Sequence, residues 1–303
     1  MIVGELPRAD LAARLNADGL RLRTGPVVTR IRSRLSSVAE GIALHYADYG
    51  VEEAEAFADF HVRIASPRSI RRWFKPQVRF DFDGASPFHP LPADQAFPML
   101  EWGLNWCVSA HCHQYLIVHA ASVEKGQRAL LLPGAPGSGK STLCAGLVSR
   151  GWRLLSDELT LIDLATGKIV PLPRPISLKN ASIDAIRVFA ANATLNPPVH
   201  DTAKGSVAHM KAPTDSVLRA SETARPRWIV LPRFRVGPPA RLEPLPRAHA
   251  FMYLAEHAFN YDVHGRRGFE CLADTVSACD CFEFEYGALG EAVTLFDALT
   301  RAA

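Results

Sequence analysis

A glycine-rich stretch near the middle of the chain has residue types and spacing suited to holding phosphate. Its sequence is GAPGSGKS, from Gly134 to Ser141, and it matches the pattern G-x-x-x-x-G-K-[ST] at every fixed position. Glycines permit a tight loop whose backbone N–H groups surround phosphate oxygens without obstruction by side chains. Lys140 has the length to reach β- and γ-phosphates, and the Ser141 hydroxyl is a ligand suited to Mg²⁺.

The segments on either side of this stretch support the same interpretation. The apolar run ALLLP precedes it as a buried strand, and STLCAGLVSRG follows it as a helix ending at Gly151. A helix that begins at the loop adds the partial positive charge of its N-terminus to the site. We therefore predict that the protein binds a nucleoside triphosphate, with ATP as the expected nucleotide, together with Mg²⁺. The predicted nucleotide-binding residues are Gly134, Ala135, Pro136, Gly137, Ser138, Gly139, Lys140, Ser141 and Thr142.

Two adjacent carboxylates, Asp157 and Glu158, follow at a short distance. Asp157 is 17 positions after Lys140, separated from it by one short helix and a turn, in the predicted strand RLLSDELTLID. We expect that strand to run next to the strand before the glycine-rich loop, which would bring the carboxylates close to the γ-phosphate. Adjacent side chains on a strand point to opposite faces, so both can serve one site only at a strand end or a bulge. A carboxylate in that place can orient and deprotonate an acceptor hydroxyl during phosphoryl transfer.

These residues resemble the C-terminal kinase domain of the HPr kinase/phosphorylase family. That family continues from its phosphate loop through a helix into an Arg-Gly-x-Arg-Leu-x-x-Asp-Asp segment, and residues 150–158, RGWRLLSDE, follow the same course at the same offset. A histidine also precedes the family's loop by 15 positions, as His119 precedes Gly134 here. The resemblance implies an α/β fold with a P-loop kinase core of the HPr-kinase C-terminal-domain type.

The resemblance also implies a role for each residue. Asp157 matches the family's catalytic Asp and is the expected general base toward a serine or threonine hydroxyl, with Lys140 as the catalytic lysine that binds phosphate. Glu158 replaces the family's second Asp and is expected to hold Mg²⁺ together with Ser141. His119 is expected to contact Asp157 and tune its proton affinity, the alternative being a structural histidine at a strand end.

Departures from the family pattern bear on the acceptor. The first 90 residues do not resemble the partner domain of the HPr enzymes, and the segment 171–179, PLPRPISLK, stands where the family has a Gly-rich signature. The sequence is more similar to HPr-kinase-related proteins of bacterial peptide-tailoring pathways, some of which resemble kinases of lasso-type precursor peptides. The implied activity is ATP-dependent phosphorylation of a Ser/Thr hydroxyl on a peptide or small protein. The ring-like oligomers of the family make a homo-oligomer a further expectation.

The residues leave several alternatives open. A kinase for a small-molecule alcohol would use the same site with a tighter acceptor pocket, and a nucleotide-binding switch ATPase would use the carboxylate to place water. Asp163 is a rival for the metal-binding acid. Arg174 and Lys179 would either clamp the triphosphate or lie on a solvated loop. The polar segment 196–213 would either close over phosphate or remain a surface loop, and its basic residues are His200, Lys204, His209 and Lys211.

The elements that must position these residues fall into two predicted domains. Residues 1–90 are predicted to form a small α+β domain, a candidate for substrate recognition, with strands around a turn at 24–26 and a helix in SSVAEGIALHYADY. The Pro-rich stretch 86–98 is the expected boundary. Residues 91–303 interleave strands and helices, which predicts the α/β kinase core, beginning with a helix from Met99 to about His111.

Composition excludes several classes of protein. The 303 residues are 48% hydrophobic, and 34 basic and 31 acidic side chains give a net charge of +3, so nothing favours nucleic-acid binding. No stretch approaches the roughly 18 apolar residues of a membrane span. The N-terminal residues lack the apolar core of a signal peptide, so a cytoplasmic protein with reduced cysteines is expected. The group Cys107, His111, Cys112 and His113 lacks zinc-site spacing and is expected to be a buried helix end.

Lysine is scarce in this chain, which makes its placement informative. Only seven of the 34 basic residues are lysines, so arginine is the usual cation. The motif requires the compact ammonium of lysine at one position, which arginine does not mimic. The lysines expected in segments around the triphosphate are Lys140, Lys179, Lys204 and Lys211.

Overall fold

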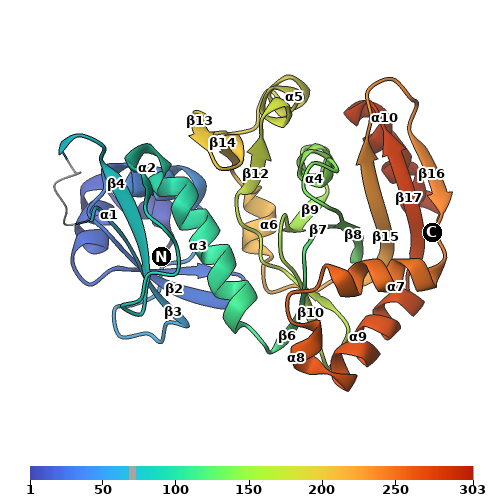
Figure 1. Ribbon diagram of the computed structural model, residues 1–303, viewed down its shortest axis with the longest axis horizontal. Coiled ribbons are helices and arrows are strands. Elements are labelled where there is room, and N and C mark those ends of the chain that lie inside the picture. Colours follow the sequence, from blue (N-terminus) through green and yellow to red (C-terminus); the bar gives the residue numbers. More distant parts are fainter. Residues whose placement is uncertain (68–72, 303) are drawn as a thin grey trace.

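The computed structural model describes residues 1–67 and 73–302, which form four β-sheets flanked by helices in a mixed α/β architecture (Figure 1). A five-stranded sheet and a six-stranded sheet lie toward opposite ends of the molecule, and the helix α3 (Ala96–His111) lies between them (Figure 1). Among the described helices, none combines the length and the apolar character needed to cross a membrane.

The five-stranded sheet is built from the N-terminal part of the chain. Its first two strands form a hairpin at the predicted turn 24–26, β2 and β3 are parallel, and the other neighbours are antiparallel. In β3 every second side chain is buried, as expected of a strand with one face on a core. The helix predicted in SSVAEGIALHYADY is confirmed as α2. The elements are η1 (Val3–Glu5), α1 (Arg8–Asn16), β1 (Leu20–Thr24), β2 (Val27–Ser33), α2 (Ser36–His45), β3 (Phe60–Ala65), β4 (Gln77–Phe82) and β5 (Leu91–Pro92).

The helix α3 packs on this sheet and confirms the helix predicted from Met99 to about His111. It follows the short helix η3 (Ala93–Gln95). Its apolar stripe recurs at intervals of three and four residues and is buried in the same hydrophobic cluster as the sheet. The residues of the stripe are Phe97, Leu100, Leu104 and Val108. A polar face of α3 is thereby left for the remainder of the chain, and Trp102 and Asn105 line a pocket there.

The six-stranded sheet has the order β16-β17-β15-β8-β7-β9. Its strands β8, β15 and β17 are parallel neighbours, while β7 runs antiparallel to both β8 and β9. Alternate residues of β8 enter two different cores: Leu130 and Leu132 pack with α4 and α10, and Leu131 packs with α7 and α9. The strands are β7 (Ala120–Lys125), β8 (Arg128–Pro133), β9 (Arg153–Ser156), β15 (Arg225–Phe234), β16 (Arg241–Pro244) and β17 (Asp280–Tyr286). The helices are α4 (Lys140–Val148), α7 (Arg247–Glu256), α8 (Tyr261–His264), α9 (Arg266–Ser277) and α10 (Leu289–Ala302).

The acidic strand does not run next to the strand of the glycine-rich loop, so that prediction is wrong. β9 pairs with β7, and β7 separates it from β8. The reason is local: β7 and β8 form a tight hairpin closed by the pair Lys125 and Arg128, which occupies that edge of β8. Because β7 is antiparallel to both neighbours, β8 and β9 run in the same direction. Their C-terminal ends therefore lie at the same edge of the sheet.

Two three-stranded sheets complete the fold. One has the order β11-β10-β6 and the other the order β12-β14-β13. The segment 196–213 forms the hairpin of β13 and β14 for most of its length, so the expectation of a surface loop is wrong there. Its second strand is buried over residues 207–210, which the polar character of the neighbouring residues conceals in the sequence. The remaining elements are β6 (Tyr115–Val118), β10 (Thr160–Asp163), β11 (Ile169–Val170), β12 (Ile176–Lys179), α5 (Ala181–Phe189), β13 (Val199–Thr202), β14 (Gly205–Met210) and α6 (Thr214–Leu218).

The proline-rich segment 171–175 is packed against the N-terminal sheet. A Cβ atom on Gly25 would lie 2.2 Å from the carbonyl oxygen of Pro171, so only glycine fits at that hairpin turn. The hydroxyl of Tyr49 donates to the carbonyl of Pro173 at 2.7 Å. This segment therefore joins the two ends of the molecule directly beside the candidate site.

Candidate active site

The glycine-rich loop connects β8 to α4, the strand, loop and helix order that its sequence predicts. Gly139 precedes the helix with φ of 93°, a left-handed conformation that favours glycine. Its carbonyl oxygen accepts a hydrogen bond of 2.9 Å from the hydroxyl of Tyr286, and the carbonyl of Ser138 accepts one of 3.0 Å from the main chain of Phe234. The loop is thus held by residues from the ends of β15 and β17.

Lys140 is buried at the first position of α4, with 7% of its surface exposed. Its Nζ atom donates to the carbonyl oxygen of Gly134 at 2.9 Å and lies 3.0 Å from Nε2 of His119. Burial lowers the pKa of His119 to about 4, and the adjacent ammonium acts in the same direction. The imidazole is therefore neutral near pH 7 and accepts a hydrogen bond from Lys140.

Both acids lie beyond the end of β9, which resolves the problem of two neighbouring carboxylates serving one site. The strand ends at Ser156, and the next two residues are no longer in the sheet. Asp157 turns inward: 5% of its surface is exposed, and its Oδ2 atom accepts the main-chain N–H of Ser177 at 3.0 Å. Among the described residues its Oδ1 atom has no hydrogen-bond partner.

Burial raises the pKa of Asp157 to about 6, and the charge of Glu158 adds to this rise. The N–H of Ser177 and the hydroxyl of Ser141 oppose it, because both stabilise the ionised carboxylate. The loop serine and the first acid therefore lie together, with one carboxylate oxygen free.

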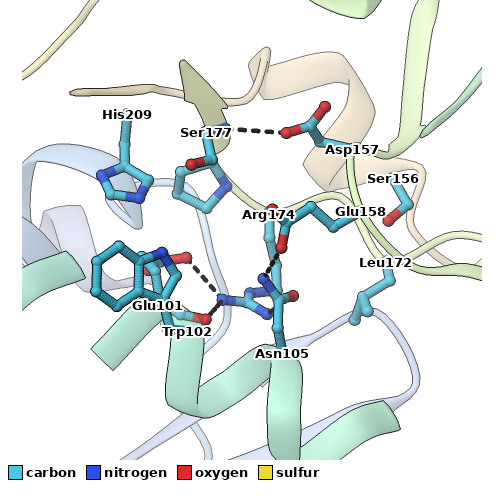
Figure 2. Close-up of a pocket in the computed structure, with 11 residues that line it drawn as sticks. Glu101, Trp102, Asn105, Ser156, Asp157, Glu158, Leu172, Arg174, Ser177 and His209 are labelled. Atoms are coloured by element: carbon cyan, nitrogen blue, oxygen red, sulfur yellow. Dashed lines mark hydrogen bonds and ion pairs between the residues drawn. The ribbon is translucent and has the colours of Figure 1, made fainter. Parts of the chain in front are cut away.

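Glu158 faces a different group of partners. Its Oε2 atom accepts a hydrogen bond of 2.5 Å from the side-chain amide of Asn105 (Figure 2). Its Oε1 atom is 3.8 Å from Nζ of Lys179. Burial raises the pKa of Glu158, but the cations outweigh this and lower it. The ammonium groups that lower it are those of Lys179, Lys204 and Lys140. The second acid is consequently a carboxylate held charged among ammonium groups.

A cleft of about 750 Å³ opens beside the glycine-rich loop. The loop residues 135–137 and 139–142 form part of its wall, together with Lys179 and Ser182. Apolar side chains from α5, β15 and α10 complete it, namely Val188, Phe189, Phe234 and Leu289. A cleft lined by both cationic and apolar side chains suits a ligand that carries both phosphates and a flat ring.

The structure brings together most of the residues predicted from the sequence. Lys140, His119, Asp157, Glu158 and Ser141 meet at the loop, joined by two of the expected lysines, Lys179 and Lys204. Lys204 also lies 5.0 Å from the ring of Trp102. The described hydrogen bonds link His119 to Lys140 rather than to Asp157.

Most of the other candidates lie outside the site. The carboxylate of Asp163 accepts bonds from Thr166 within the turn after β10, so it does not serve as the rival metal ligand. Lys211 pairs with Asp48 at 2.9 Å, away from the loop. His200 is exposed, whereas His209 is 1% exposed and lines the same pocket as Asp157, Glu158 and Asn105 (Figure 2). Asp163, Lys211 and His200 share basic or acidic character with the site but not its location, so His209 is the candidate of this group that the site includes.

Both alternatives that the sequence left open for Arg174 are wrong. It neither clamps the candidate nucleotide cleft nor lies on a solvated loop, because 6% of it is exposed and it pairs with Glu101 at 2.7 Å. Sequence reasoning missed Asn105, Trp102 and Ser177 as members of the site.

Comparisons with known proteins give a weak similarity to solved structures. No protein-family profile matches the chain, and no curated protein matches its sequence. Among solved structures, the chain is similar to the HPr(Ser) kinase/phosphatase from Coxiella burnetii, with 13% sequence identity and a TM-score of 0.28. The match covers 62% of this chain and 99% of the other. A similarity this low assigns no activity, and the expectations of a peptide-tailoring role, a homo-oligomer and a cytoplasmic location stay predictions.

Proposed function

We propose that the protein is an ATP-dependent kinase that transfers the γ-phosphoryl group to a Ser/Thr hydroxyl of a peptide or small protein. One observation carries the proposal: a glycine-rich loop, its buried lysine and two differently placed carboxylates converge at one edge of the sheet. In phosphoryl transfer the protein mainly positions groups and neutralises charge, and these are the groups that such a reaction needs.

The cleft beside the loop accommodates the nucleotide in this proposal. The phosphates lie on the loop and the N-terminus of α4, where backbone N–H groups and the helix dipole favour anions. The apolar side chains of the cleft, Phe234 and Val188 among them, receive the nucleoside. Lys140 moves from the carbonyl of Gly134 to the terminal phosphates when they are present.

Ser141 and Asp157 fit the requirements of a Mg²⁺ site. A buried carboxylate oxygen without a partner and a loop hydroxyl beside it are oxygen ligands of the kind that Mg²⁺ binds together with nucleotide phosphates. Bound there, Mg²⁺ would neutralise charge on the β- and γ-phosphate oxygens.

We assign the general base to Glu158, which reverses the two roles that the family resemblance implies. Asp157 is enclosed and directed to Ser141 and Ser177, whereas the side chain of Glu158 keeps 18% of its surface exposed. The acceptor hydroxyl donates its proton to Glu158 as its oxygen forms the new bond to the γ-phosphorus. The bond from that phosphorus to the β–γ bridging oxygen breaks, and ADP leaves with the electron pair.

The test is direct phosphorylation of peptides. The protein is incubated with ATP, Mg²⁺ and serine-containing peptides, including lasso-type precursor sequences, and products are analysed by mass spectrometry for one added phosphoryl group. Lys140→Ala is expected to lower the rate at least about 100-fold, because it removes a charge that stabilises the transferring phosphoryl group. Lys168→Ala, at a turn away from the site, is the matched control.

The same experiment separates the competing activities. ADP formation without phosphopeptide, whatever acceptor is offered, and unchanged by Glu158→Gln, would overturn the kinase proposal in favour of an ATPase switch. Phosphorylation of a small alcohol but of no peptide would overturn the acceptor class. Full turnover by Lys140→Ala would remove the glycine-rich loop from the mechanism.

A further inference from the structure

The carboxylate of Glu158 is held by a helix outside the sheet that carries the glycine-rich loop. Its hydrogen-bond donor, Asn105, is on α3, which packs on the N-terminal sheet and not on the sheet that carries the glycine-rich loop. The two residues are 53 positions apart in the chain. The candidate site is therefore completed by an element that contributes no residue to the loop or the cleft.

The orientation of the Asn105 amide is fixed by charges on both sides. The guanidinium of Arg174 donates from Nη1 to Oδ1 of Asn105 at 2.7 Å, so the oxygen of the amide must face Arg174. A guanidinium has no acceptor and an ionised carboxylate has no donor, so the NH₂ group must face Glu158. Figure 2 shows the amide in this position between the two charged groups.

Arg174 is itself fixed by a buried carboxylate. Its Nη2 atom donates to Oε2 of Glu101 at 2.7 Å and to the Glu101 carbonyl at 2.9 Å, and Oε1 of Glu101 accepts the hydroxyl of Tyr46 at 2.6 Å. Arg174 and Glu101 are 6% and 3% exposed. Buried ion pairs are weak contributors to stability compared with well-packed apolar side chains, whereas they do fix geometry. The pair is thus suited to holding Asn105 in one place.

We propose that Asn105 is a positioning residue for Glu158, locked in its orientation by the buried pair of Arg174 and Glu101. This inference rests on the proposed function, in which Glu158 is the base. Asn105 donates a hydrogen bond to Oε2 and thereby fixes the direction of the carboxylate. Oε1 is then the oxygen that receives the proton of the acceptor hydroxyl. Since small displacements of a reacting group slow transfer strongly, loss of Asn105 lowers the rate of the chemical step more than it changes nucleotide binding.

The variant Asn105→Asp tests this role. It keeps the oxygen that faces Arg174, but it loses the donor and places a second carboxylate against Glu158. The kcat for peptide phosphorylation is expected to fall roughly 10- to 100-fold, with the KM for ATP changed less than about twofold. Asn192→Asp, at an exposed position outside the site, is the matched control and is expected to keep the wild-type kcat. Wild-type kcat in Asn105→Asp, or an equal change in kcat and in the KM for ATP, would overturn the proposal.

A double variant tests the contact without relying on activity. Asn105→Asp combined with Glu158→Gln exchanges the donor and the acceptor, so the hydrogen bond is restored with its partners reversed. Thermal unfolding of the wild type, both single variants and the double variant is expected to be non-additive, with the double variant regaining stability lost by Asn105→Asp. Its kcat stays low because the base is absent.

The outcomes separate the inference from the proposed function. Additive shifts in melting temperature would overturn the Asn105–Glu158 contact even if the wild type phosphorylates peptides. A wild type that forms no phosphopeptide would instead overturn the proposed function and with it the positioning role, whereas non-additive shifts would still establish the contact.

Discussion

The Nζ atom of Lys140 lies 3.0 Å from Nε2 of His119 and 2.9 Å from the carbonyl oxygen of Gly134. Because burial holds the pKa of His119 near 4, its ring is neutral at physiological pH and accepts a hydrogen bond from the ammonium. The histidine therefore acts on the lysine of the loop. The family resemblance led us to expect a contact with Asp157 instead.

The effect of replacing His119 on the KM for ATP is expected to depend on whether the new side chain can accept a hydrogen bond. His119→Leu leaves a buried ammonium with one partner fewer, so we expect the KM for ATP to rise roughly tenfold. His119→Gln retains an acceptor and is expected to stay closer to the wild type. Initial rates at varied ATP concentration measure both, with the exposed His200→Gln as control. Equal KM values in the Leu and Gln variants would contradict the role given to His119.

The two acids are expected to respond differently to amide substitution. Asp157→Asn weakens the proposed Mg²⁺ site, so the Mg²⁺ concentration needed for half-maximal rate should rise about 10- to 100-fold. Glu158→Gln removes the proposed base, so kcat should fall about 100- to 10,000-fold with little change in the Mg²⁺ requirement. Mg²⁺ titrations of the phosphorylation rate distinguish the two effects. The reverse pattern would restore the roles that the family resemblance implies.

Lys204 and Lys211 form a matched pair for testing the cations around Glu158. Lys204 lies over Trp102 and acts on Glu158, whereas Lys211 pairs with Asp48 outside the site. Lys204→Met is expected to lower kcat/KM about tenfold, which corresponds to about 1.4 kcal/mol, because it removes a cation that stabilises the charged form of Glu158. Lys211→Met is expected to leave kcat/KM unchanged. Steady-state kinetics check both, and equal losses would mean that Lys204 acts only through folding.

The part of the site that could be predicted from the sequence is the part that local backbone geometry determines. The glycine-rich motif specifies a strand, a turn and a helix N-terminus within one short segment, so Lys140 and Ser141 were found from spacing alone. The acids after β9 were found for the same reason. The strand that pairs with β9 was not predicted correctly, because the order of strands depends on which edge the β7–β8 hairpin leaves free.

The polar connections across the molecule could not be predicted in the same way. Asn105 and Glu158 are 53 positions apart, and Arg174 and Glu101 are 73 apart, so their contacts follow from the packing of α3 against the segment 171–175. One signal was present nonetheless. Glu101 and Asn105 lie four residues apart, on one face of a helix whose other residues are mostly apolar.

Two buried histidines should make the stability of the fold depend on pH. The rings of His45 and His209 lie 6.2 Å apart, are 0% and 1% exposed, and have no hydrogen-bond partner on either ring nitrogen among the described residues. Burial lowers the pKa of His45 to about 4 and that of His209 to about 3. Both histidines therefore remain neutral in the folded protein at pH values where the unfolded chain binds protons.

The direction in which pH changes the stability follows from the lowered pKa values of the two histidines. Above about pH 6.5, the pKa of histidine in the unfolded chain, neither the folded nor the unfolded state is protonated at these positions, so the two histidines reduce the free energy of unfolding by nothing there. Between about pH 6.5 and the folded values, the unfolded state binds more protons, so the free energy of unfolding falls as the pH falls. Each histidine is expected to lower the free energy of unfolding at pH 5 by about 2 kcal/mol relative to pH 7.5.

Denaturant unfolding at pH 7.5 and pH 5 measures this contribution. His209→Gln and His45→Gln should each reduce the difference between the two free energies of unfolding by about 2 kcal/mol, whatever they do to stability at either pH. The change in the difference is the informative quantity, because it cancels the packing cost of the substitution and the opposite contribution of Asp157, whose pKa is raised. His61→Gln, at an exposed position on β3, should leave the difference unchanged. An unaltered pH dependence in both buried variants would mean that these histidines are protonated within the fold, which would require charged or hydrogen-bonded partners in the core around Phe97.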